Sequence, residues 1–102
     1  MKPRRRVAIT GVGMVTPVGG DAPTSWASLL AGRSGVGPIR QFDASGFPVR
    51  IGAEVKDVPP EATFCDPRLL KFASRSHRFA LAAADEALGD AGVRPSADNS
   101  HR

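Results

Sequence analysis

The sequence has 102 residues, of which 41% are hydrophobic and 24% are charged, a composition that excludes a wholly disordered chain and allows one globular domain or a piece of one. The net charge of +4 raises the question of nucleic-acid binding. However, the sequence has no RRM, KH or zinc-finger spacing and no Tyr, so we expect no nucleic-acid partner.

The start of the chain imitates an export signal, because the basic segment 2–6 precedes an apolar run. Gly11, Gly13 and Pro17 break that run, so we reject both a signal peptide and a twin-arginine signal. No stretch approaches the roughly 18 apolar residues of a membrane span. The single cysteine, Cys65, allows no internal disulfide and is typical of a reducing compartment. We therefore expect a cytoplasmic protein without a membrane partner.

The first predicted element is a strand at 7–10, which lacks polar alternation and so resembles a strand buried on both faces. Gly11 and Gly13 follow it and mark a place where the backbone passes close to another element or takes unusual dihedral angles. They predict no dinucleotide site, because Thr16 replaces the third glycine and Pro17 prevents a helix from starting. The chain has too few other strands to surround this one, which predicts an N-terminal fragment of a larger domain.

A short helix is predicted after Asp21, a good N-cap, with Pro23 in its first turn. Gly32 is placed to end this helix in a left-handed cap. The apolar residues of the helix fall on one face, at Trp26, Leu29 and Leu30. Trp26 is therefore predicted to be a core anchor.

The middle of the chain is predicted to be a turn-rich connection at 35–38, followed by a loop at 43–46 that Phe42 and Phe47 hold in place. The segment 49–55 then alternates, which predicts a one-sided strand suited to an edge or an antiparallel ribbon. The side chains predicted to point inward from it are Val49, Ile51, Ala53 and Val55.

From Asp66-Pro67 to about Ala91 the pattern is helical, and Gly92 is placed to close it. Ser74 marks a potential break, so this region forms one helix or two that meet near Ser74. A face of small residues is predicted to pack tightly against a sheet or another helix. Its members are Ala73, Ala80, Ala84, Leu88 and Ala91, with Ala83 and Ala87 on the flank.

The side chains best suited to catalysis or metal binding are too far apart to form a metal site: Cys65, His77 and His101. Cys65 lies next to a carboxylate, which disfavours a reactive thiolate, and is predicted to be a small semi-buried residue. His77 lies between arginines and is predicted to be on a solvated face.

Four basic residues fall at helical spacings of three, four and three along the second helical region: Arg68, Lys71, Arg75 and Arg78. Two interpretations remain open for them. They form an ordinary solvated face, or a docking patch for an acidic partner.

Several stretches together resemble the N-terminus of β-ketoacyl-acyl carrier protein synthases, above all the ketosynthase II type. They are RVAITGVGMVTPVG, SWASLLAGRSGVGPI, FDASGFPVRIGAEV and FALAAADEALGDAGV, in this order over residues 6–93. The stretch 72–79 is nearer to ketosynthase I or polyketide-type relatives. The resemblance implies an α/β chain with a partial thiolase fold, the N-terminal portion of the first α/β half of an α/β/α/β/α layered fold. It also implies one incomplete domain, 1–102, that is family-like over 7–93 and ends in a tail at 94–102.

The function that the resemblance implies is decarboxylative Claisen condensation of an acyl chain with malonyl-acyl carrier protein, in fatty acid or polyketide biosynthesis, by a homodimer. The family uses a cysteine nucleophile and two histidines that lie beyond residue 102, and Cys65, His77 and His101 match none of them. We therefore expect no catalytic residue, metal or cofactor in this chain, and no activity from it alone.

One binding feature can be carried over from the family, because its carrier-protein patch includes basic residues that match Arg68 and Lys71. These two would meet the acidic surface of the carrier and the phosphate of its phosphopantetheine. Two alternatives remain: part of a non-catalytic partner that resembles a chain-length factor, or a small module that binds carrier protein.

Overall fold

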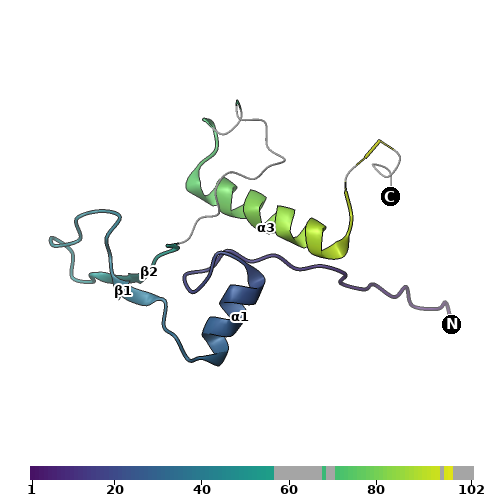
Figure 1. The fold of residues 1–102 in the computed structure, drawn as a ribbon, viewed down its shortest axis with the longest axis horizontal. Helices are drawn as coiled ribbons and strands as arrows, with labels where there is room; N and C mark the ends of the chain where they lie inside the picture. The colour runs from purple at the N-terminus through teal and green to yellow at the C-terminus, as the bar shows by residue number, and fades with distance from the viewer. Residues whose placement is uncertain (57–67, 69–70, 95, 98–102) are drawn as a thin grey trace.

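The computed structural model describes residues 1–56, 68, 71–94 and 96–97. In this part of the chain the elements are helix α1 (Ala22–Leu30), strands β1 (Val36–Pro38) and β2 (Ile51–Ala53), and helix α3 (Arg75–Ala91). Figure 1 shows a long N-terminal segment that runs beside α3, with α1 on its other side and the β1–β2 ribbon at the far end. The described part thus combines helices with one small sheet, consistent with part of an α/β fold.

Helix α1 begins and ends where the sequence predicts. The Asp21 carboxylate accepts a hydrogen bond from the Thr24 N–H at 2.8 Å, which satisfies one of the free donors of the first turn. A proline lies in that turn, where its missing N–H is tolerated. After the helix, Gly32 has a φ of 67°, and this left-handed conformation suits glycine best.

The buried face of α1 is made of hydroxyls, and the prediction of Trp26 as a core anchor is wrong within this chain. Ser25 and Ser28 are buried, whereas Trp26 is 61% exposed. Ser25 Oγ lies 2.8 Å from Thr16 Oγ, and Ser28 Oγ donates to the Val18 carbonyl at 2.8 Å. The helix therefore packs on a polar turn whose backbone groups the serines satisfy, and no described element covers its apolar side.

The segment 16–19 forms the tight turn on which α1 packs. The Thr16 N–H donates to the Gly19 carbonyl at 2.8 Å, and the Gly19 N–H donates back at 3.2 Å. A Cβ on Gly19 would lie 2.6 Å from the Ser25 backbone nitrogen, so only glycine allows α1 to approach this closely.

Strands β1 and β2 form an antiparallel ribbon, so the turn-rich connection predicted at 35–38 is partly a strand. The register pairs Val36 with Ala53, Gly37 with Gly52 and Pro38 with Ile51. The predicted strand 49–55 is shorter than expected, and its inward set is not covered: Val49 is 66% and Ile51 60% exposed. A ribbon of two strands leaves both faces open unless another element packs on one of them.

The loop that joins the two strands is held by its aromatic residues, as predicted. The rings of Phe42 and Phe47 meet edge to face, with centroids 6.0 Å apart. The Phe47 N–H donates to the Ala44 carbonyl at 3.0 Å. Ala44, at 7% exposure, is the buried hydrophobic residue of the described part of the chain.

Helix α3 begins after Ser74, which places a helix start at the break that the sequence indicates there. Ser74 and His77 form a reciprocal capping box: the His77 N–H donates to Ser74 Oγ at 3.4 Å, and the Ser74 N–H donates to His77 Nδ1 at 3.1 Å. Gly92 ends the helix with a φ of 68°, as predicted. The predicted start at Asp66-Pro67 lies outside the described residues.

The strand predicted at 7–10 is absent from the N-terminal segment, and its predicted burial is wrong for this chain. Val7 is 92% exposed and Ile9 is 85% exposed. A strand exists only through hydrogen bonds to a neighbouring strand, and no described strand pairs with this segment. The apolar pattern at 7–10 is therefore typical of a paired and buried strand, and the described residues neither pair with this segment nor cover it.

The predicted close approach at Gly11 and Gly13 is confirmed, and the element approached is α3. A Cβ on Gly13 would lie 2.8 Å from the carbonyl carbon of Ala83, and a Cβ on Gly11 would lie 2.6 Å from the Ala91 nitrogen. Real side chains do not approach backbone atoms so closely, so glycine is required at both positions by packing. Neither glycine has a positive φ.

The small-residue face of α3 is rotated from the one that the sequence predicts. The segment 11–13 packs on Ala83, Ala87 and Ala91, two of which were assigned to the flank. Ala80 and Ala84, assigned to the centre, are exposed.

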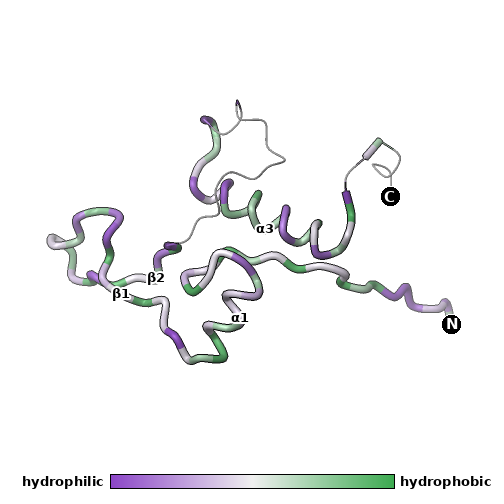
Figure 2. Tube along the Cα trace, in the orientation of Figure 1, coloured by the Kyte–Doolittle hydropathy of each residue, from purple (hydrophilic) through white to green (hydrophobic). Residues whose placement is uncertain are grey.

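Hydrophobic residues are spread over all elements instead of forming one interior, as Figure 2 shows. The Cα radius of gyration is 17.8 Å, whereas a compact domain of about 100 residues has about 13 Å. The segments of the described part are held together by hydrogen bonds between side chains and backbone groups and by close glycine contacts, and its apolar faces are largely uncovered.

Candidate functional site

Two carboxylates on α3 organise the meeting point of the N-terminal segment with both helices. Glu86 Oε2 accepts the Met14 N–H at 2.8 Å, and its Oε1 accepts the Ala22 N–H at the start of α1 at 2.7 Å. One turn further on, Asp90 Oδ2 accepts the Val12 N–H at 3.1 Å. Charge-assisted bonds of this kind are stronger than neutral ones. All three donors are backbone N–H groups of other segments, so the role of these carboxylates in the described structure is to position those segments.

Sequence reasoning missed Glu86 and Asp90. Their i, i+4 spacing on a helix was visible, but two carboxylates at that spacing are usual on a solvated helix face. Only the packed segment reveals that the donors facing them are backbone N–H groups.

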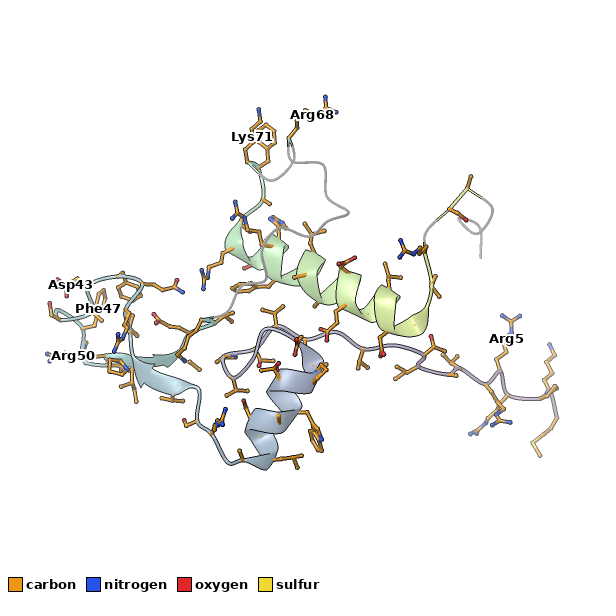
Figure 3. The ribbon with its side chains drawn as sticks, in the orientation of Figure 1. Arg5, Asp43, Phe47, Arg50, Arg68 and Lys71 are labelled. Atoms are coloured by element: carbon orange, nitrogen blue, oxygen red, sulfur yellow. The ribbon has the colours of Figure 1, made fainter. Side chains whose placement is uncertain are left out.

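The predicted carrier-protein residues, Arg68 and Lys71, both lie on the chain that leads into α3. Both are exposed, and Figure 3 shows them close together, pointing away from the β1–β2 ribbon and from α1. The Lys71 ammonium lies 5.0 Å from the centroid of the Phe72 ring, a cation–π distance that holds it over the ring.

The structure does not place the four predicted basic residues along one helical face. Helix α3 starts at Arg75, and Lys71 lies in a turn before it, so the spacing argument fails between these two. Arg75 instead turns toward the ribbon: its Nη2 donates to the Val55 carbonyl at 2.6 Å, and its guanidinium lies 5.0 Å from the Phe79 ring centroid. Of these residues, Arg68 and Lys71 therefore point away from the ribbon, whereas Arg75 faces it.

A groove of about 680 Å³ lies between the ribbon and the start of α3. Three cationic side chains from separate segments line it: Arg40, Lys56 and Arg75. Its apolar lining comes from Gly37, Pro38 and Val55.

The one carboxylate of this groove is already used by the backbone. Glu54 Oε1 accepts the N–H groups of Arg40 and Gln41, both at 3.1 Å. Lys56 Nζ donates to the Gly35 carbonyl at 3.1 Å. The charges of Lys56 and Arg75 thus meet carbonyl oxygens in the described structure, and the groove carries an excess of positive charge.

The residues with catalytic or metal-binding chemistry stay apart. His77 is exposed, as predicted, and its ring caps α3, a role that sequence reasoning missed because the second residue of a capping box is usually Glu or Gln. Cys65 and His101 lie outside the described residues. Within the residues that are described, no group of three or more His, Cys, Asp or Glu side chains could hold a metal ion. None of the described helices is long and apolar enough to cross a membrane.

Two carboxyls have shifted acidity, and in both cases the cause is local. The Thr24 side chain and N–H hold the pKa of the Asp21 carboxyl below its usual value. The Ser45 side chain and N–H do the same for the pKa of Asp43, whose carboxylate accepts the Ser45 N–H at 3.0 Å. Both groups are structural, because they close a helix start and a loop.

Comparison with known proteins identifies the family. Residues 4–102 match the model of the beta-ketoacyl synthase N-terminal domain. The chain is 42% identical over 99 residues to 3-oxoacyl-[acyl-carrier-protein] synthase 2 of Coxiella burnetii, covering 97% of this chain and 24% of that protein. It is 44% identical over 89 residues to the tetracenomycin polyketide synthase ketoacyl synthase beta subunit of Streptomyces glaucescens, covering 87% and 22%.

A solved structure shows the same likeness in three dimensions. The ishigamide ketosynthase/chain length factor superposes with a TM-score of 0.79 at 39% identity, covering 90% of this chain and 23% of that one. The chain thus spans about a quarter of the length of the relatives that it matches. By sequence and by fold, the chain belongs to the beta-ketoacyl synthase family, within the N-terminal domain of that family.

Proposed function

We propose that this chain is the N-terminal part of a 3-oxoacyl-acyl carrier protein synthase, which joins an acyl chain to malonyl-acyl carrier protein by decarboxylative Claisen condensation. The observation that carries the proposal is the match of residues 4–102 to the family model. Residues 1–102 would form one incomplete domain, family-like over 7–93, and contribute the start of the first half of a layered thiolase fold. The nucleophilic cysteine and the histidines would come from other parts of the protein.

The exposed apolar surface supports this role. Trp26 at 61%, Leu30 at 71% and Ile9 at 85% exposure are large side chains of the kind that folded domains cover. Covering them with further layers of the domain would turn the N-terminal segment into a paired strand, as its sequence predicts. A small independent carrier-binding module is the less suitable alternative, since a stable module would need its own core.

Arg68 and Lys71 are the proposed contact with acyl carrier protein. Both are basic and exposed and lie three positions apart in the chain, and clustered cations of this kind attract an acidic surface and a phosphate. In the whole protein the chain would act as a docking element, in a homodimer that works on carrier-bound acyl and malonyl groups in the cytoplasm.

The test is condensation by the complete protein with acyl- and malonyl-acyl carrier protein, followed as formation of the β-ketoacyl product. The complete protein should turn over, and residues 1–102 alone should not. Arg68→Glu with Lys71→Glu should raise the carrier Kd roughly tenfold at low salt, because each reversed charge costs about 0.7 kcal/mol and about 1.4 kcal/mol corresponds to a factor of ten. Arg33→Glu, an exposed reversal elsewhere, is the matched control. An unchanged carrier Kd in the double variant would remove the docking role.

A non-catalytic partner that resembles a chain-length factor is the second candidate. It is favoured by the similarity to a ketoacyl synthase beta subunit and to a ketosynthase/chain length factor structure. In that case the complete protein would lack the nucleophilic cysteine and would give no product alone. Product formation only after addition of a catalytic ketosynthase partner would identify this second role.

A further inference from the structure

The groove between the β1–β2 ribbon and α3 has features of a binding site for a negatively charged ligand. Arg40, Lys56 and Arg75 reach it from three separate segments. Repulsion between like charges that lie close together raises the free energy of the folded state unless an opposite charge lies nearby. The only described carboxylate in the groove lining is Glu54, and backbone N–H groups already occupy its oxygens.

Two of the three cations, Lys56 and Arg75, are held in place, which prepares the groove for a ligand. Lys56 Nζ is fixed by the Gly35 carbonyl, and the Arg75 guanidinium by the Val55 carbonyl. A carbonyl oxygen orients a cation without neutralising it. Each of these groups also keeps further N–H donors, since an ammonium has three and a guanidinium five. Side chains ordered in advance lose less entropy when a ligand binds.

The size and lining of the groove indicate which anion fits. Its volume of about 680 Å³ is in the range of sites for extended organic ligands and is far larger than a single inorganic ion requires. Its floor includes apolar surface from Pro38 and Val55. An extended peptide with several carboxylates can contact the floor with its backbone and stems while its charges meet the cations.

We propose that this groove binds an acidic segment of a protein partner, at a place separate from Arg68 and Lys71. The proposal does not depend on the condensation activity, because it follows from the charges and shape of the ribbon and of α3. Arg75 leads the helix that also receives the N-terminal segment. A partner bound in the groove would therefore contact α3, the same helix that holds the N-terminal segment.

The test is binding of fluorescein-labelled hexaglutamate to the complete protein that contains residues 1–102, at about 20 mM salt, measured by anisotropy, with labelled hexalysine as the control peptide. Arg40→Gln and Lys56→Gln should each weaken binding about two- to fivefold, and both together about tenfold. Arg40→Lys keeps the charge and should keep the affinity. Arg33→Gln, an exposed position outside the groove lining, should leave the affinity unchanged. Screening should weaken the wild-type complex as salt rises.

Amide NMR spectra keep the test decisive if a variant folds poorly. Hexaglutamate added to the complete wild-type protein should shift the signals of Gly37 and Val55, which line the groove. The proposal is overturned if the shifts cluster at Lys71 instead, if Arg33→Gln weakens binding as much as Arg40→Gln, or if hexaglutamate does not bind. Displacement of the peptide by equimolar inorganic phosphate would also overturn it, because it would show a site for a small ion.

Discussion

Removing the Glu86 carboxylate tests how the N-terminal segment, α1 and α3 are joined. Its two oxygens accept the Met14 and Ala22 N–H groups at 2.8 and 2.7 Å, which links segments 64 and 72 residues apart in the sequence. Glu86→Ala removes both acceptors. Because the Met14 and Ala22 donors are tied to this side chain, both should become more accessible to water.

The size of the effect follows from the two hydrogen bonds. A net contribution of about 1 kcal/mol is typical for a protein hydrogen bond, and partial exposure of this site argues against the higher values seen for buried charged pairs. Each amide should therefore exchange about fivefold faster in Glu86→Ala, since about 1.4 kcal/mol corresponds to a factor of ten. Glu86→Gln keeps one acceptor oxygen but presents an NH₂ group to the second donor, so it should affect one amide more than the other.

Hydrogen exchange of single amides, followed by NMR, measures these changes. Asp85→Ala is the matched control, because the neighbouring carboxylate has no hydrogen bond to the N-terminal segment within the described structure. Faster exchange at Met14 and Ala22 in Glu86→Ala, but not in Asp85→Ala, is the expected result. Equal exchange in wild type and Glu86→Ala would refute the assigned role of Glu86.

Two further predictions concern the close approach at α3 and the start of α1. Gly13→Ala places a Cβ against the Ala83 carbonyl and should displace the segment from α3 at a cost of about 1–3 kcal/mol. It would be seen as shifted Ala83 and Ala87 amide signals, whereas Gly46→Ala, where a Cβ meets nothing within 4 Å, should change little. Acidification should weaken the α1 cap. The hydrogen bond from Thr24 lowers the pKa of Asp21 below its ordinary value of 3.8. The stabilisation is therefore present above that ordinary value and is lost as the pH falls through the folded-state pKa. The protection of the Thr24 amide from pH 5 to 2, taken as its exchange rate relative to the intrinsic rate of a free amide at the same pH, measures this. Asp21→Asn should abolish the pH dependence of that protection while keeping the cap, and a protection that still varies with pH in that variant would show that another group is responsible.

Local signals in the sequence predicted the ends of the helices well. The Asp21 cap, Gly32, the break at Ser74 and Gly92 all depend on interactions within a few residues, which a linear pattern contains. The pinned loop between Phe42 and Phe47 belongs to the same class. These features form wherever the chain is placed, because their partners are neighbours in sequence.

Burial was the property that the sequence pattern misjudged. Apolar spacing predicted that Trp26, Ile51 and the strand at 7–10 would face a core, but all are exposed in the described structure. Periodicity states which side of an element is apolar and does not say what covers it. The exposed faces agree with a chain that spans about a quarter of the length of its relatives.

The sequence by itself indicated the family, the helix caps and a close approach or unusual dihedral angles at Gly11 and Gly13, because residue types and their order carry these signals. Only the tertiary structure decided that α3 is the element approached, through Ala83 and Ala87, and that Glu86 holds two distant backbone donors. It also decided that Arg75 faces the ribbon while Lys71 faces away. The physical reason is that contacts between segments far apart in the chain depend on how the helices are rotated and where the chain turns, and no local pattern records either.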